Sequence, residues 1–352
     1  MKPCEPFSGQ RTTRLLDDAA NGLALTWVTS SGDGPTDWTE LGDLDWSRFR
    51  LVLGAGGASG GAFTVGALLA LATDHGVNVR NASHLVGTSA GAVLAALMAS
   101  GLDSEDLAAM VARTPEWLSP VGDAYHPGFG DHAPKMPKLR DLLRPMGPRD
   151  LVRSASLAAT RRYRALWLHS LRPGTFDIAP QLPFMSMLSW PADRNLSICC
   201  TDTADARRVV YDRENSVELA DAIAGSCAVP GVMRPIPIGG RVVVDGGVVS
   251  PTNADVALCD GESTLTVVVS PMSGTGSRSA LGRASSIFAA NRLSGELRTR
   301  KPQGGVLVIE PAATLGGLVI DDALDGSTST QILATTFLAA SGAEITHRRL
   351  AA

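Results

Sequence analysis

The chain has 352 residues, of which 44% are hydrophobic and 19% are charged, and its formal net charge is −4. This composition is typical of a globular protein with a large apolar core. No apolar run reaches the roughly 18 residues that a membrane-spanning helix needs.

The N-terminal residues and the cysteines indicate the cellular compartment. Residues 1–5 lead into polar sequence, which differs from the apolar core of a secretory signal. The five cysteines are an odd number and show no CxxC spacing, so disulfides and zinc are not expected. We expect a cytoplasmic protein with buried, reduced thiols.

The organised part of the chain begins near residue 49. Residues 1–48 are expected to form an N-terminal extension, with one strand from Leu23 to Val28. A short apolar strand at 50–53 is followed by a glycine-rich stretch at 54–61 and by a helix from about 62 to 74. A strand, a glycine loop and a helix N-terminus together form a cradle for an anion.

Two ligands fit such a cradle. One is a nucleotide phosphate, but no Gly-Lys-Ser/Thr follows, and Ser59 stands where a dinucleotide fingerprint has its third glycine. The other is the oxyanion of an acyl-transfer intermediate. The residues alone leave both open.

Gly87-Thr88-Ser89-Ala90-Gly91 lies between an apolar strand and a helical segment at 92–98. A serine between glycines at a strand-to-helix turn is typical of a nucleophile elbow. The pattern is weak, because the chain has 37 glycines and repeats it around Ser59. Ser59 stands six residues beyond the last strand residue, too far for a tight elbow, so we favour Ser89.

A basic segment follows a helix predicted at 104–113. Residues 135–172 contain ten Lys or Arg and two Asp. We expect residues 135–190 to form a basic helical insert that acts as a lid or faces a membrane, since basic and aromatic side chains bind anionic bilayers. The alternative is a solvated basic face. The acidic remainder and the lack of a motif argue against nucleic acid.

The rest of the chain alternates strands with helices. This order predicts an open α/β sheet. We expect strands at 196–201, 207–211, 241–244, 265–269 and 305–309, and helices at 219–225, 280–299 and 329–343. Residues 49–312 would form the catalytic domain and residues 313–352 a helical C-terminal tail.

A nucleophilic serine needs a base. His347 is the only histidine that follows Asp245, as the chain order of a Ser-Asp-His triad requires, but it lies in a charged tail. Asp245 ends a Val-Val-Val strand next to Gly246. Desolvation there would raise the pKa of its carboxyl and make it a better base.

Three motifs in this order resemble the patatin-like phospholipases. They are the glycine stretch at 54–61, the Ser89 pentapeptide, and the segment that runs from Ser226-Cys227-Ala228-Val229-Pro230-Gly231 to Asp245-Gly246-Gly247. The resemblance covers about residues 50–260. It implies a three-layer α/β/α fold with a mainly parallel sheet and a Ser–Asp dyad that needs neither metal nor cofactor. Ser89 would be the nucleophile, Asp245 the base, and the N–H groups of Gly56 and Gly57 the oxyanion hole.

The leading hypothesis is therefore a serine acyl hydrolase that cleaves lipid or other carboxylic esters. One departure from the family pattern is Ser59, which stands where the family usually has a basic residue. One alternative is a Ser-His-Asp esterase that uses His347. Another is a membrane-surface or signalling protein on the same scaffold, with peripheral membrane contact through residues 135–172 and little catalysis.

Overall fold

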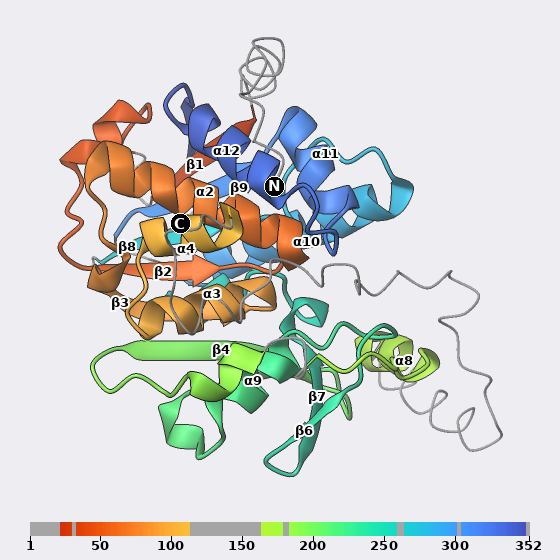
Figure 1. Ribbon diagram of the computed structural model, residues 1–352. Coiled ribbons are helices and arrows are strands. Elements are labelled where there is room, and N and C mark those ends of the chain that lie inside the picture. Colours follow the sequence, from red (N-terminus) through yellow and green to blue (C-terminus); the bar gives the residue numbers. More distant parts are fainter. Residues whose placement is uncertain are drawn as a thin grey trace, which may run out of the picture.

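A sheet of ten strands organises the described part of the chain, which comprises residues 22–29, 33–112, 163–178, 183–258, 264–300 and 304–349 of a computed structural model (Figure 1). Nine strands follow the order β10-β1-β9-β8-β2-β3-β4-β7-β6, and β5 pairs with β4 beside this path. The strands are β1 Leu23–Thr29, β2 Phe49–Leu53, β3 Ala82–Thr88, β4 Asn195–Asp202, β5 Arg208–Tyr211, β6 Ile236–Ile238, β7 Arg241–Asp245, β8 Leu265–Val269, β9 Val306–Pro311 and β10 Ile345–Arg349.

The middle of the sheet is parallel. Strands β9, β8, β2, β3 and β4 pair in parallel one after another. Antiparallel pairs join β1 to β9, β4 to β7 and β7 to β6. The two strands predicted at 196–201 and 207–211 are present as β4 and β5, which pair antiparallel. The prediction of a mainly parallel α/β sheet is confirmed.

Helices cover both faces of the sheet. Residues of a strand point alternately to opposite faces, and in β2 Leu51 and Leu53 belong to one core whereas Val52 belongs to another. The first core lies under α2, α3, α4, α9 and α12, and the second lies under α10. The helices are α2 Gly57–His75, α3 Ala90–Ala99, α4 Ser104–Ala112, α8 Tyr163–Ser170, α9 Leu219–Ser226, α10 Ala280–Thr299, α11 Ala313–Asp321 and α12 Ser329–Ala340. This arrangement confirms the three-layer α/β/α fold.

Both terminal segments contribute strands to the sheet. Strand β1 lies between β9 and β10, so the described part of the N-terminal extension is built into the sheet. The tail at 313–352 was expected to be helical, and this is wrong for β10. Ile345 is the only buried residue of β10, and its other four residues are exposed. Charged side chains are typical of edge strands, so the sequence there shows little apolar pattern.

The loop in the glycine-rich stretch is shorter than the sequence predicted. Helix α2 begins at Gly57 rather than near residue 62, so only residues 54–56 link β2 to it. Glycine is a poor helix former, which explains the late predicted start. Tertiary packing compensates, because α2 runs beside α12 across the sheet (Figure 1).

Most of the predicted basic insert lies outside the described residues, because residues 113–162 and 179–182 are not described. Its described part includes α8 and a short 3₁₀ turn, Pro183–Met187. None of the helices in the described ranges is both long enough and apolar enough to span a bilayer.

The three cysteines in the described part, Cys199, Cys200 and Cys227, are buried and free. Burial raises the pKa of the Cys199 thiol to about 12, so it stays protonated at neutral pH. Cys4 and Cys259 lie outside the described residues.

The contact between α2 and α12 leads to a prediction about stability. A Cβ atom at Gly66 would lie 2.7 Å from the carbonyl oxygen of Leu333 in α12, whereas one at Gly295 in α10 would meet nothing within 4 Å. We expect Gly66→Ala to destabilise the fold by about 1–3 kcal/mol through overpacking. The matched change Gly295→Ala should stabilise it by about 0.5–1 kcal/mol. Urea unfolding measures both, and equal effects would contradict the close packing.

Candidate active site

Ser89 forms the turn between β3 and α3. Strand β3 ends at Thr88 and helix α3 begins at Ala90. The backbone of Ser89 has φ 55° and ψ −124°, a conformation that residues with a side chain rarely adopt. This is the strained strand-to-helix elbow that the sequence predicts for a nucleophile.

A hydrogen-bonded relay holds the backbone of this elbow. The N–H of Ser89 donates to Ser226 Oγ at 2.9 Å, and the Ser226 hydroxyl donates to the carbonyl of Cys199 at 2.7 Å. Ser226 ends α9 and is fully buried. The relay ties the elbow to β4 and occupies the Ser89 N–H, which is therefore not available to bind a substrate oxygen. Ser226 lies in the quoted motif, but the sequence alone assigned it no role.

Strand pairing brings Asp245 to the same place. Thr88 at the end of β3 lies opposite Cys199 of β4, and Asp245 at the end of β7 lies opposite Cys200. The carboxyl ends of β3 and β7 are thus one residue apart along β4. The Ser89 side chain is close enough to Asp245 to lower the pKa of its carboxyl as a hydrogen-bonding partner. The fold thus brings together two residues that lie 156 positions apart in the sequence.

The surroundings of Asp245 favour a proton acceptor near neutral pH. Only 6% of Asp245 is exposed. Burial raises the pKa of its carboxyl to about 6, and hydrogen bonds from Ser89 and from the Gly247 N–H offset part of that rise. The bond from Gly247 to Asp245 Oδ1 is 2.7 Å long and fixes the orientation of the carboxylate. Its other oxygen can accept a proton.

The glycine loop lies beside the elbow because β2 and β3 are parallel neighbours. The N–H groups of Gly54 and Ala55 donate to backbone carbonyls of adjoining segments. In the described part of the chain, the N–H groups of Gly56 and Gly57 donate to no other group. Gly57 must be glycine, since its φ is 58° and a Cβ atom there would lie 2.1 Å from the carbonyl oxygen of Ala323. The start of α2 therefore presents two available donors.

Ser59, the serine of the second G-x-S-x-G, has a different environment. It lies in the first turn of α2 and is fully buried. Its Oγ lies 2.9 Å from the carbonyl oxygen of Asp322 and 3.0 Å from that of Asp325. The side chain therefore holds the connection between α11 and α12, and no base adjoins it.

His347 lies far from the elbow. It is in β10, and four strands separate β10 from β3, a distance of roughly 24 Å at the usual strand spacing. Its Nε2 lies 2.9 Å from the carbonyl oxygen of Pro35. The structure does not bring His347 to Ser89, so the histidine alternative lacks its base.

No other described histidine adjoins the elbow. His84 lies near the amino end of β3, where its Nε2 contacts Ser197 Oγ at 2.9 Å and burial lowers its pKa to about 4. His75 ends α2 and His169 lies in α8. His126 and His132 lie outside the described residues.

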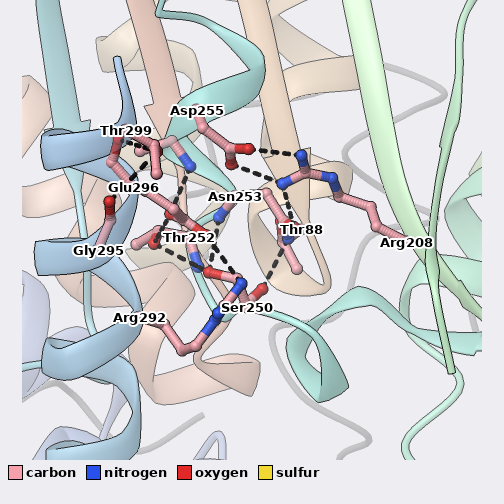
Figure 2. Close-up of polar contacts among 11 residues, drawn as sticks. Thr88, Arg208, Ser250, Thr252, Asn253, Asp255, Arg292, Gly295, Glu296 and Thr299 are labelled. Atoms are coloured by element: carbon pink, nitrogen blue, oxygen red, sulfur yellow. Dashed lines mark hydrogen bonds and ion pairs between the residues drawn. The ribbon is translucent and has the colours of Figure 1, made fainter. Parts of the chain in front are cut away.

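Sequence reasoning missed a polar network behind the elbow, drawn in Figure 2. Asn253 Nδ2 donates to Thr88 Oγ1 at 3.0 Å, and Arg208 forms two 2.6 Å bonds to Asp255 beside it. Asn253 follows the predicted Asp245 by eight residues, but nothing in its local pattern points to the elbow. The contact exists because η8, the 3₁₀ turn Ala254–Val256, packs under the sheet.

A family model described as patatin-like phospholipase matches residues 51–258, which is more than half of the chain. The chain belongs to the patatin-like phospholipase family. The matched region of this patatin-like chain contains the glycine loop, the elbow at Ser89 and the strand that ends at Asp245. The family is one of lipid acyl hydrolases.

Among solved structures, the patatin-like chain is similar to the crystal structure of VipD from Legionella pneumophila, with 18% sequence identity and a TM-score of 0.37. The match covers 75% of this chain and 55% of VipD, so the chain spans about half of that protein. No curated protein matches it.

The buried carboxyl of Asp245 leads to a prediction about pH and stability. Its pKa rises from 3.8 in the unfolded chain to about 6 in the fold, so the folded state binds the proton more tightly. The free energy of unfolding must therefore fall as pH rises through this window, by roughly 3 kcal/mol in all. Asp245→Asn removes that loss. We expect the variant to gain stability over the wild type between pH 4 and pH 8.

Urea unfolding of both proteins at several pH values measures this difference. Subtracting the wild-type curve from the Asp245→Asn curve removes the titration of all groups that the two proteins share. A difference that stays constant with pH would show that the pKa of Asp245 is the same in the folded and unfolded states.

Proposed function

We propose that the protein is a serine acyl hydrolase that cleaves the carboxylic esters of lipids, with Ser89 as nucleophile and Asp245 as general base. The observation that carries this proposal is the strained elbow at Ser89, which strand pairing places beside the buried carboxyl of Asp245. Burial raises the pKa of that carboxyl to about 6. A base with a pKa close to the working pH removes a proton efficiently and is still ionised when needed.

In the first half of the reaction, Asp245 takes the hydroxyl proton of Ser89 while Oγ attacks the ester carbonyl carbon. The carbonyl oxygen becomes an oxyanion that accepts hydrogen bonds from the N–H groups of Gly56 and Gly57. These donors belong to the start of α2, where the helix dipole also favours negative charge. Asp245 then donates the proton to the departing alcohol oxygen, which leaves an acyl group on Ser89.

In the second half, water attacks the acyl carbonyl and gives one proton to Asp245. The intermediate collapses, the acid is released, and the proton returns to Ser89 Oγ. One aspartate thus alternates between base and acid, and the same oxyanion donors serve both halves. The Ser226 relay supports this cycle because it holds the elbow while charge develops.

Lipid esters are the proposed substrate class because the family acts on lipids. We also propose that the basic segment at 135–172 contacts an anionic bilayer. Of its described residues, Trp167 in α8 is 49% exposed, which suits a side chain that enters the headgroup region. Arginines of the same segment would attract anionic lipid at about 1 kcal/mol each.

The nucleophile is tested with a fluorophosphonate probe, which labels activated serines. We expect the wild type to be labelled and Ser89→Ala to be unlabelled. Ser59→Ala is the matched control: it should be labelled at the wild-type rate but unfold more easily, because it loses a buried hydrogen bond worth about 1 kcal/mol. Labelling that persists in Ser89→Ala and disappears in Ser59→Ala would reverse the assignment.

A lipid panel run on wild type and Ser89→Ala then identifies the substrate, with phospholipid, lysophospholipid, triglyceride and a short-chain ester as its members. Liposome flotation without labelling or hydrolysis would instead favour the membrane-surface protein.

The base is tested by the pH dependence of labelling. We expect the rate to rise with pH and to level off above an inflection at about 6, since a protonated Asp245 cannot accept the serine proton. His347→Ala should show the same inflection and plateau. If His347→Ala loses both, the histidine esterase is the better hypothesis.

A further inference from the structure

We infer that Asn253 is a positioning residue for the nucleophile, which it holds in place through the side chain of Thr88. This inference rests on the proposed function of Ser89. Asn253 and Thr88 are both fully buried, and Asn253 Nδ2 donates to Thr88 Oγ1 at 3.0 Å (Figure 2). Thr88 precedes Ser89 directly, so a shift of its side chain reaches the elbow.

The orientation of the Asn253 amide is set from the opposite side. Arg208 Nη1 donates to Asn253 Oδ1 at 3.2 Å, and a guanidinium can only donate. The amide oxygen must therefore face Arg208, which leaves Nδ2 to face Thr88. Arg208 is itself fixed by its two bonds to Asp255, each 2.6 Å long. This fork-to-carboxylate pair ties Asn253 to β5.

The backbone of Asn253 is fixed independently. Its φ of 53° lies in the left-handed region, which asparagine tolerates better than most residues. The buried carboxylate of Glu296 in α10 accepts from Thr252 Oγ1 at 3.1 Å and from the N–H of Ala254 at 2.9 Å. Glu296 thus holds the residues on both sides of Asn253, as Figure 2 shows.

Thr88 passes this constraint to the elbow. Its Oγ1 accepts from Asn253, and Thr88 lies opposite Cys199 in the pairing of β3 with β4. The bond from the fixed amide therefore restricts the rotamer of the Thr88 side chain. The elbow is therefore held from both layers, by Ser226 from α9 and by Asn253 from the side of α10.

The contact between Asn253 and Thr88 would help to enforce the geometry of Ser89. Ser89 has a strained backbone conformation that persists only when its surroundings enforce it. Its hydroxyl must also stay in line with Asp245 and the substrate, since a misplacement of about 1 Å can lower a rate roughly 100-fold. Losing the Asn253 contact should therefore lower kcat more than it raises KM.

Two variants break the contact from its two ends. Asn253→Ala removes the amide that donates to Thr88, and Thr88→Val removes the acceptor. We expect each to lower the phosphonate labelling rate and kcat by about 10- to 100-fold, with KM close to the wild-type value. Thr88→Ser keeps the hydroxyl and should restore most of the activity. The double variant should be no slower than the slower single variant, because both act through one contact.

The matched control is Thr336→Val in α12. Thr336 is as fully buried as Thr88, and its hydroxyl also makes one hydrogen bond, 2.7 Å long, to the carbonyl of Ile332. We expect the control to lose stability but to keep the wild-type kcat and labelling rate. If Asn253→Ala and Thr88→Val match the control in both respects, the inference is wrong. Losses that multiply in the double variant would overturn it equally. If one variant does not fold, the other decides.

A measurement without substrate separates this inference from the proposed function. Backbone hydrogen exchange of peptides that cover residues 84–96 should be several-fold faster in Asn253→Ala and Thr88→Val than in Thr336→Val. Absence of wild-type labelling and hydrolysis would refute the proposed function alone. Equal exchange in all three variants would refute the positioning role, whatever the activity.

Discussion

The contact between Ser89 and a carboxyl that is almost fully removed from water is the interaction on which the site depends. In water a carboxylate near pKa 4 would be a weak base for a hydroxyl. At the end of β7 the loss of hydration raises the pKa of the Asp245 carboxyl. The hydrogen bond from Gly247 keeps the carboxylate oriented. In the proposed mechanism this carboxyl has the role that a histidine has in a triad.

The sheet is arranged so that this contact forms. Strand β4 pairs with β3 through Cys199 and with β7 through Cys200, so that two strands far apart in the chain end at neighbouring positions. Strand β2 ends on the other side of β3 and places the start of α2 beside the elbow. A shift of β7 by one residue would turn Asp245 to the opposite face of the sheet.

The helices and apolar cores on the two faces of the sheet stabilise a site that is itself strained. Ser89 and Asn253 have positive φ, and Asp245 and Glu296 are buried carboxyls, so all four oppose folding locally. The two apolar cores on either side of the sheet stabilise the fold enough to tolerate them. Local rules are thus broken where the proposed chemistry takes place, although positive φ also occurs at Ala206, Ser216 and Ala313.

The sequence by itself determined the α/β class and most of the elements, and it favoured Ser89 over Ser59. These follow from short-range patterns, because strands, helices and a glycine-flanked elbow are encoded in neighbouring residues. The pairing of Ser89 with Asp245 was predicted from the resemblance of three motifs to a family. The start of α2 and strand β10 were missed, since glycines and charges hide elements that packing and pairing stabilise. Only the tertiary structure decided that His347 is remote, that Ser59 serves the α11–α12 connection, and that Asn253 reaches Thr88. Each of these depends on residues distant in the chain, whose contacts are set by strand order and layer packing.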